Sequence, residues 1–514
     1  MEKRVIFLLL LFATVCYFPL FLHLDVLSLR MWDEARRAVN ALEMATNGNW
    51  LVTHYDGKPE MWGTKPPLLI WCQAICMKLF GYNEFALRLP PALAGVGTIA
   101  MLTLFAHRVL KKPLIGVFAG LILVTSRGFI YAHITRTGDF DSLLVLFENL
   151  YLLLFFCFFV SVEKLRKTRF LYLAAGAAVL AGLTKGIAAF FFVPGIFLFC
   201  LFEKELLGIL KNKHLWAAVL LVLGCVAGFY VLRNAFNPGY LDMVWEEEIG
   251  GRFMKSKTGH KFPWYHYIEM WIFPKQRFAP WVFFLPLGIF AAWRTGGRTW
   301  LFAKLLLINS VFFMTVVSAA GTKLAWYQAP VFPGVSLLVA IGLERLCQGL
   351  KDYTAAENVR VGTTALLLFG LAFWGYPYFE TIQRVYNPVP SQWDGDDTKF
   401  GNFMKIIADE DNYTIAHAGY NSHATFYRKA YNLRGYNIQN QAMHDFYNKK
   451  TSFGEGKLNF MPGDTVMMCE SKVRKRFGKF YEYETIREWD KCVLRVVKGK
   501  VPPKTEADND KNEN

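Results

Sequence analysis

Two adjacent carboxylates and a lysine are the residues of this chain best suited to chemistry. Asp33 and Glu34 follow the first apolar segment, and Lys65 comes later in a Lys-Pro-Pro turn. Charged groups beside a membrane are costly to place, so their presence there favours a chemical role. A carboxylate can act as a base or orient a nucleophile, and an ammonium can pair with a phosphate. The alternative is structural, since Asp33 can also begin a helix and pair with Arg36 and Arg37.

The composition is that of an integral membrane protein. The chain has 514 residues, is 54% hydrophobic and contains 46 Phe and 15 Trp, with the apolar residues in long blocks. Its formal net charge is +16. In a soluble protein this charge would suggest nucleic acid, but no basic groove-binding module is present. Basic loops that fix membrane topology and meet lipid headgroups explain the charge, so we expect no nucleic acid partner.

Hydropathy predicts a polytopic α-helical membrane protein with 11 to 13 spans. The basic N-terminus is followed by an apolar run that is long for a signal peptide, and no cleavage site follows it. We therefore predict a retained first span and a cytoplasmic N-terminus. The predicted spans lie near residues 5–22, 89–106, 113–132, 142–160, 170–184, 187–202, 215–232, 278–293, 300–318, 328–346 and 361–379.

The charged residues of interest fall on one predicted side of the membrane. The short loops on the other side are basic, as expected of cytoplasmic loops. The outer side receives two long loops, about 23–88 and 233–277, and the C-terminal region. Short helices are expected at 29–47 and 67–80 of the first long loop. The residues predicted to share the outer face are Asp33, Glu34, Lys65, Asp139, Asp141, Lys185, His260 and Lys323.

Three regions are expected along the chain. Residues 1–390 form the transmembrane part, 391–500 a small α/β domain outside the membrane, and 501–514 a charged, disordered tail. Cys469 and Cys492 fall in two predicted strands of the α/β domain. A disulfide between them is plausible in an oxidising compartment, and two buried free thiols are the alternative.

Several short motifs in this order resemble the GT-C class of membrane glycosyltransferases. The resemblance is strongest to glycosyltransferase family 39 and the lipid A aminoarabinose transferases, and it covers about residues 5–346. Each motif alone is weak, but six in register are fairly specific. They are Asp33-Glu34-x-Arg36, Asn47-Gly48-Asn49-Trp50, Lys65-Pro66-Pro67-Leu68 with Trp71, Phe80 to Glu84 with Arg88-Leu89-Pro90, Leu183-Thr184-Lys185-Gly186, and Lys323-Leu324 with Tyr327 and Pro330.

Two positions depart from the pattern of the aminoarabinose transferases. Thr64 stands where they usually have a Glu directly before the Lys-Pro-Pro lysine, and that Glu is associated with a metal site in the family. Glu60 is a weak substitute for it. Arg37 stands where the family often has Tyr. Whether a metal takes part is therefore open.

The resemblance implies transfer of a sugar from a polyprenyl phosphate on the outer face of the inner membrane. Asp33 would act as base or orient the acceptor, and Glu34 would support it. Lys65 would hold the donor phosphate, unless it only reaches the headgroups. Arg36 would contact the phosphate or hold Asp33. Lys185 and Lys323 would also contact the phosphate, or else set the topology.

A second acidic residue and a metal ligand are also expected from the resemblance. Asp141 is the candidate for the second carboxylate, whereas Asp139 could instead cap the following helix. His260 is the candidate ligand of a divalent metal, although a surface His is more often solvated. The acceptor would be lipid A, another envelope glycan or a protein, reached by an inverting, metal-assisted or metal-independent mechanism. The rival function is a transporter or flippase for a lipid-linked sugar, which predicts internal repeats and charges at mid-membrane.

Overall fold

The computed structural model describes residues 3–131, 133–251, 262–273, 278, 280–356, 362–388, 395–442 and 459–501. Its contacts divide the chain into two compact units. The first, here called the helical unit, comprises Met1–Leu24, Met44–Gly81 and Phe85–Pro388. The second, the α/β unit, comprises Asp25–Glu43, Tyr82–Glu84 and Val389–Asn514. The expected boundary at residue 390 stays a prediction, because the α/β unit also takes in part of the first long loop.

The helical unit is built from apolar helices joined by short turns. In chain order its elements are α1 (Lys3–Phe21), β1 (His54–Tyr55), β2 (Lys58–Pro59), α3 (Leu68–Phe80), α4 (Glu84–Arg108), α5 (Pro113–Val124), α6 (Arg127–Ile130), α7 (Asp141–Val160), α8 (Lys164–Lys185), η1 (Gly186–Phe190), α9 (Val193–Phe202), α10 (Leu206–Leu210), α11 (Lys213–Phe236), α12 (Tyr240–Val244), the π-helical η2 (Trp245–Gly251), α13 (His266–Ile272), η3 (Trp281–Phe284), α14 (Leu285–Thr295), α15 (Gly297–Ala319), η4 (Ala329–Val331), α16 (Phe332–Ala356) and α17 (Gly362–Tyr386).

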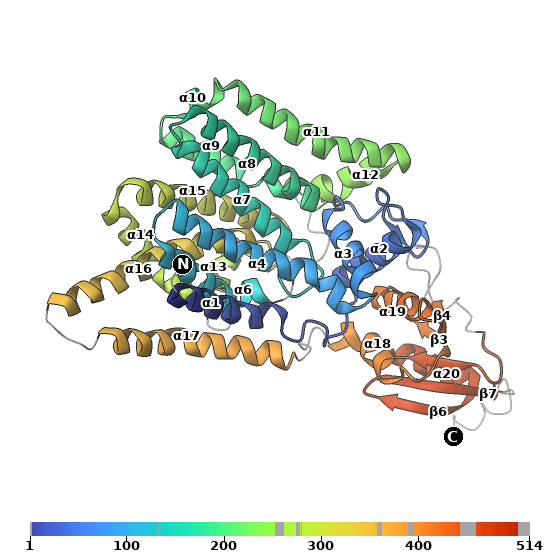
Figure 1. Ribbon diagram of the computed structural model, residues 1–514. Helices are drawn as coiled ribbons and strands as arrows, with labels where there is room; N and C mark the ends of the chain where they lie inside the picture. Colours follow the sequence, from blue (N-terminus) through green and yellow to red (C-terminus); the bar gives the residue numbers. More distant parts are fainter. Residues whose placement is uncertain are drawn as a thin grey trace. The chain divides into compact units, whose positions relative to one another are not determined.

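Every predicted span coincides with one or more of these helices. Among the described residues, six helices are long and apolar enough to cross a membrane, and several shorter apolar helices accompany them. The long helices pack against their neighbours along their lengths, with α8 between α7 and α11, and α16 against α5 and α14. Figure 1 shows α7, α8 and α11 running side by side. The prediction of a polytopic helical membrane fold is confirmed.

One predicted span is divided between two helices. The pattern favoured a span over 113–132, but α5 stops at Val124. The hydroxyls of Thr125 and Ser126 donate to the carbonyls of Leu121 and Ile122 in its last turn. The chain resumes as the short α6.

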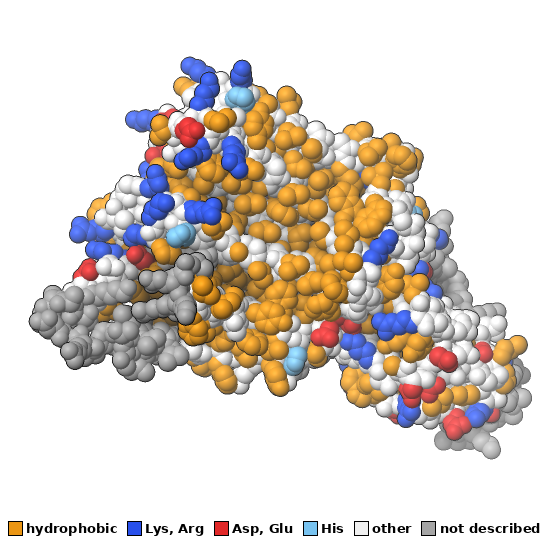
Figure 2. Space-filling model, viewed as in Figure 1, with side chains coloured by type: hydrophobic (Ala, Val, Ile, Leu, Met, Phe, Trp, Pro, Cys, Tyr) orange, Lys and Arg blue, Asp and Glu red, His pale blue; other side chains and the backbone are white. Residues whose placement is uncertain are grey.

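The surface of the helical unit has a large apolar part and a basic end, as expected of a membrane protein. Large apolar side chains are exposed along α11, among them Leu220 and Val231. In Figure 2 apolar side chains cover much of this unit, and Lys and Arg gather at the end where α9, α10 and α14 lie. Such an apolar surface suits lipid, and basic side chains at one end suit a headgroup layer. The chain is therefore a multi-pass membrane protein.

The α/β unit contains a five-stranded mixed sheet. Its elements are α2 (Asp33–Asn47, with Asp33–Glu43 in this unit), α18 (Gly395–Ile406), β3 (Asn412–His417), α19 (Ser422–Asn432), β4 (Asn437–Ala442), β5 (Thr465–Met468), α20 (Ser471–Phe480), β6 (Tyr481–Trp489) and β7 (Cys492–Lys500). The strand order is β4-β3-β5-β7-β6. The pairs of β3 with β4 and β5 are parallel, and β7 is antiparallel to β5 and β6.

Part of the first long loop is packed inside the α/β unit. The Leu29 amide donates to the Tyr427 hydroxyl at 2.9 Å, and the Ser422 hydroxyl donates to the Met31 carbonyl. Trp32 stacks on Tyr420 with 5.4 Å between ring centroids. These contacts hold the residues before Asp33 in a non-helical conformation. The helix expected over 29–47 therefore begins only at Asp33, whereas the helix expected over 67–80 is observed as α3 and ends at Gly81, as predicted.

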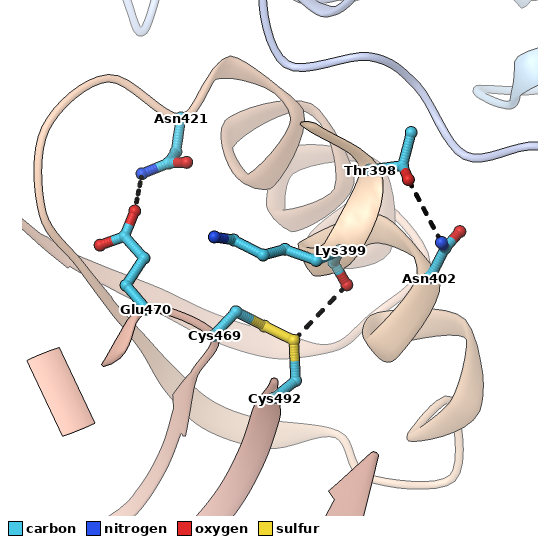
Figure 3. The surroundings of a disulfide bond; sticks show 7 residues. All are labelled: Thr398, Lys399, Asn402, Asn421, Cys469, Glu470 and Cys492. Atoms are coloured by element: carbon cyan, nitrogen blue, oxygen red, sulfur yellow. Dashed lines mark hydrogen bonds between the residues drawn. A yellow bond between two sulfur atoms is a disulfide. The ribbon is translucent and has the colours of Figure 1, made fainter. Parts of the chain in front are cut away.

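A disulfide joins two neighbouring strands of the sheet. Cys469 follows the last residue of β5 and Cys492 begins β7, and the register pairs the adjacent Met468 with Val493. The two cysteines therefore face each other across the ladder. Figure 3 shows the bond beside α18, where the sulfur of Cys492 lies 3.7 Å from the Lys399 carbonyl oxygen. The expected disulfide is present, and the alternative of two free thiols is not.

Removing this disulfide is expected to destabilise the α/β unit. The bond closes a loop with a sequence separation of 23, so replacing both cysteines by Ser should lower the free energy of unfolding by roughly 3 kcal/mol. Thermal unfolding of the full chain in detergent measures the change, and non-reducing mass mapping detects the bond. Cys225→Ser, which removes an exposed free thiol, is the control. A mapping that finds Cys469 and Cys492 both alkylated would contradict the disulfide.

Candidate active site

Three of the residues singled out from the sequence line one cavity of the helical unit. The cavity has a volume of about 310 Å³. Its charged lining consists of Lys65 from the turn before α3, Asp141 at the start of α7, Lys185 at the end of α8, and Glu248 from η2. The remaining lining is mainly apolar and includes Leu144, Phe191, Phe313, Val316, Val317 and Pro330. The arrangement combines a few converging charges with an apolar wall, as ligand sites commonly do.

The charges in the cavity form two ion pairs. The Lys185 ammonium donates to Asp141 Oδ1 at 2.5 Å, and the Lys65 ammonium donates to Glu248 Oε1 at 2.5 Å. All four side chains are largely buried, with 6 to 15% of each exposed. An unpaired charge in such surroundings would be costly, so each ammonium is held by its own carboxylate. Both lysines offer further donors to an incoming anion.

Lys185 is placed by the glycine that follows it. Gly186 ends α8 with a φ of 61°, in the left-handed region that glycine adopts readily. A Cβ at this position would come within 2.5 Å of the Tyr230 hydroxyl. The chain therefore turns sharply after Lys185, and the ammonium is left at the cavity with 5.5 Å between Nζ and the centroid of the Tyr327 ring.

The loop that carries Lys65 is fastened to two helices. At the end of α11, the Arg233 guanidinium donates to the carbonyls of Leu51 and Glu60 at 3.1 and 2.9 Å. The Tyr240 hydroxyl of α12 donates to the Gly63 carbonyl at 3.0 Å. Burial raises the pKa of the Tyr240 phenol above its usual value, so the group stays a neutral donor. These bonds fix the turn that delivers Lys65 to the cavity.

Lys323 lies at the margin of the cavity rather than in its lining. Its neighbours Ala320 and Thr322 line the cavity, but the Lys323 ammonium donates to the Ala320 carbonyl at 2.8 Å. Tyr327, which follows Lys323 in the connection between α15 and η4, does line the cavity. A role of Lys323 in phosphate binding stays a prediction.

The acidic motif lies in the α/β unit, at the start of α2. Asp33 contacts Arg36 and Arg37 at 3.3 and 3.6 Å, so the ion pairs of the structural alternative are present. About 37% of the Asp33 side chain is exposed. Glu34 is buried and accepts a hydrogen bond from the Arg30 amide at 3.1 Å, across the first turn of the helix. This geometry suits the expected difference between an accessible Asp33 and a supporting Glu34.

Asp139 does not cap α7. The residue at the cap position is Phe140, whose side chain makes no capping hydrogen bond. Asp139 is buried, and its carboxylate lies 3.2 Å from His133 Nδ1. The His133 ring stacks on Trp326 with 3.5 Å between centroids, and its backbone has a φ of 66°. This largely buried pair brings together two groups of the kind that bind divalent metals.

Glu248 was not predicted from the sequence, and His260 lies outside the described residues. Glu248 ends a run of three Glu residues in the second long loop. The Thr64 hydroxyl and the Lys65 ammonium both donate to its Oε1. The carboxylate next to the Lys-Pro-Pro turn therefore comes from residue 248, while residue 64 is Thr.

Comparisons with known proteins find similarity in both the sequence and the fold of this chain. Residues 64–231 match the sequence profile of the family described as dolichyl-phosphate-mannose-protein mannosyltransferase. The fold is similar to that of ArnT from Cupriavidus metallidurans, solved bound to undecaprenyl phosphate, with a TM-score of 0.71, 16% identity and coverage of 95% of this chain and 97% of that one. It is also similar to the oligosaccharyltransferase AglB from Archaeoglobus fulgidus, with a TM-score of 0.53, 16% identity and coverage of 81% and 63%.

Curated relatives of known sequence are similar to this chain over about two thirds of its length. Two of them are named undecaprenyl phosphate-alpha-4-amino-4-deoxy-L-arabinose arabinosyl transferase. The one from Pseudomonas savastanoi is 27% identical over 70% of this chain and 64% of its own length, and the one from Shewanella sediminis is 30% identical over 65% and 61%. An uncharacterised protein of Aquifex aeolicus is 28% identical over 66% and 64%. The chain thus spans less than two thirds of these relatives, and the resemblance drawn from the motifs is confirmed.

Substituting Gly186 is expected to disturb the cavity. Gly186→Ala should lower the free energy of unfolding by about 1–2 kcal/mol, because Ala disfavours the left-handed backbone and its Cβ meets Tyr230. Gly176→Ala is the matched control, since it lies within α8 and a Cβ there meets nothing within 4 Å. The control substitution should raise the free energy of unfolding by roughly 0.5–1 kcal/mol, because Ala favours a helix more than Gly does. Thermal unfolding in detergent measures both changes. Equal effects of the two variants would contradict the requirement for glycine at position 186.

Proposed function

We propose that this protein transfers a sugar from a polyprenyl phosphate donor to an acceptor on the periplasmic side of the inner membrane. The observation that carries the proposal is the cavity in which two buried lysines converge beside an apolar wall. Two ammonium groups suit a phosphate, and the wall formed in part by Phe191, Phe313 and Val317 suits a prenyl chain. The names of the curated relatives support undecaprenyl phosphate as the carrier.

In the proposed mechanism the donor phosphate takes the place of carboxylates at the two lysines. Lys65 leaves Glu248 and Lys185 leaves Asp141, and both ammonium groups then pair with the phosphate. When the sugar–phosphate bond breaks, negative charge grows on the leaving phosphate. Two fixed cations in a poorly hydrated cavity stabilise that charge. The sugar reacts from the opposite face, so its anomeric configuration is inverted.

The acceptor is activated by a carboxylate in this proposal. If the acceptor is a hydroxyl, Asp33 removes its proton, with Arg36 and Arg37 holding the carboxylate in place. If the acceptor is a phosphate of lipid A, it is already nucleophilic and Asp33 positions it. Asp141, once Lys185 turns to the donor, is available as the second carboxylate. Lipid A, another envelope glycan or a protein would be acceptors of suitable chemistry.

A divalent metal fits the residues of the helical unit only in part. His133 and Asp139 would supply two ligands of the kind that zinc and manganese accept. When bound, such an ion would supply positive charge that can stabilise a phosphate. AglB, which is similar in fold, has been solved with zinc and sulfate. Metal-assisted and metal-independent transfer are both compatible with the two lysines as the main phosphate ligands.

Replacing Asp33 tests the catalytic assignment. Asp33→Asn keeps the shape of the side chain but removes the base, so transfer should fall by roughly 10²- to 10⁴-fold. Membranes containing each variant are supplied with radiolabelled polyprenyl phosphate sugars, and label in lipid, glycan and protein fractions is counted. Glu43→Gln on the same helix is the matched control, because Glu43 pairs with Lys429 and should be dispensable for chemistry. Full activity of Asp33→Asn would refute the role of Asp33.

Replacing the cavity lysines tests phosphate binding. Lys65→Met and Lys185→Met should each weaken binding of undecaprenyl phosphate by roughly 10- to 100-fold, because hydrogen bonds between charged groups are worth about 1.5–3 kcal/mol. Calorimetry on the purified protein in detergent measures the affinity, and size-exclusion chromatography checks that each variant is folded. Lys304→Met, which loses a lysine paired with Glu203 elsewhere, is the control. Unchanged affinity in both cavity variants would remove the basis of the proposal.

A further inference from the structure

The sheet of the α/β unit changes its direction of growth between β3 and β5. The crossover from β3 through α19 leads to β4 on one side of β3, whereas β5 pairs with β3 on the other side, and both pairs are parallel. In open α/β sheets the carboxyl ends of two such strands form a crevice where ligands commonly bind. Two short connections leave this end of the sheet, residues 418–421 after β3 and residues 469–470 after β5.

Glu470 joins these two connections. Its Oε2 accepts a hydrogen bond from the Ala418 amide at 2.5 Å, and its Oε1 accepts one from the Asn421 side chain at 3.1 Å. Figure 3 shows Glu470 and Asn421 meeting beside the disulfide. Hydrogen bonds to a carboxylate are stronger than those between neutral groups. Gly419, with a φ of 78°, supplies the left-handed backbone of the turn. Glu470 therefore fixes the turn at residues 418–421.

This turn holds the segment that leads into Asp33. Tyr420, within the turn, stacks on Trp32. The hydroxyl of Ser422, the buried residue directly after the turn, donates to the Met31 carbonyl. Both segments belong to the α/β unit. The end of the sheet at which related architectures bind a ligand is thus packed against the chain's own acidic motif.

The local ion pairs of Asp33 cannot replace these contacts. Asp33 Oδ1 lies 3.3 and 3.6 Å from the guanidinium groups of Arg36 and Arg37. These pairs orient the carboxylate relative to α2, but they do not place α2 itself, because all three residues belong to that helix. The contacts of the two residues before Asp33 set where the helix begins. A displacement of about 1 Å at a reacting group can lower a rate by roughly 100-fold.

We propose that Glu470 is a positioning residue for Asp33 that acts through the turn at residues 418–421 and through Ser422. The proposal rests on the proposed function, in which Asp33 activates or orients the acceptor. It assigns to the α/β unit the placement of this carboxylate, whereas the phosphate ligands Lys65 and Lys185 belong to the helical unit. Loss of Glu470 therefore affects turnover and leaves the affinity for the donor phosphate unchanged.

The first test compares turnover with phosphate affinity in variants of the full chain. Glu470→Ala should lower sugar transfer by roughly 10-fold, because the turn loses two hydrogen bonds and Asp33 is less well placed. Its affinity for undecaprenyl phosphate, measured by calorimetry, should equal that of the wild type. Glu470→Gln keeps one oxygen acceptor and should restore part of the turnover. Glu484→Ala, which removes a carboxylate paired with Lys498 in the same unit, is the matched control.

A double variant separates positioning from a general loss of stability. In the Asp33→Asn background, Glu470→Ala should cause no further loss of turnover, because residues that act through one another are not additive. Hydrogen exchange of the full chain in detergent gives a readout independent of activity. The backbone amides of residues 29–33 should exchange roughly 10-fold faster in Glu470→Ala than in the wild type or in Glu484→Ala.

The outcomes distinguish this inference from the proposed function. Full turnover of Glu470→Ala, with turnover lost in Asp33→Asn, would overturn the inference alone. A further loss in the Asp33→Asn background, or unchanged exchange at residues 29–33, would also overturn it and leave Glu470 with a structural role. If the wild-type chain transfers no sugar, the proposed function fails at that first measurement, and this inference fails with it.

Discussion

The need to keep two ammonium groups stable in a largely apolar cavity shapes this protein. Lys65 and Lys185 are each held by a carboxylate, from Glu248 and Asp141. The pairs join the first long loop to the second and α7 to α8, so the same bonds that neutralise the cavity also tie its walls together. Each ammonium in the cavity is therefore balanced by a carboxylate, and an anion that binds there competes with that carboxylate.

Local sequence signals predicted much of the fold. Long apolar runs located the membrane helices, and Gly81 marked the end of the helix expected over 67–80. The apolar runs at residues 413–416, 465–469 and 492–497 became the three central strands β3, β5 and β7. The edge strands β4 and β6 were missed because their outer position lets them carry polar and charged residues, which hides the strand pattern.

The partners of the charged residues were harder to predict, because they are distant in sequence. Nothing near Thr64 indicates that its hydroxyl and the Lys65 ammonium meet a carboxylate from residue 248. Nor does the sequence indicate that the segment carrying Asp33, expected in the first outer loop, packs with C-terminal residues in one compact unit.

The two parts of the α/β unit are synthesised at different times, because they lie at opposite ends of the chain. Residues Asp25–Glu43 leave the ribosome early, but the strands and helices against which they pack follow from Val389 onward. At roughly 5–20 residues per second, a gap of about 350 residues takes on the order of 20 to 70 s. During this time the membrane helices can insert and assemble, while the segment carrying Asp33 waits for its packing partners. The acidic motif would therefore reach its final environment only after the membrane helices have been synthesised.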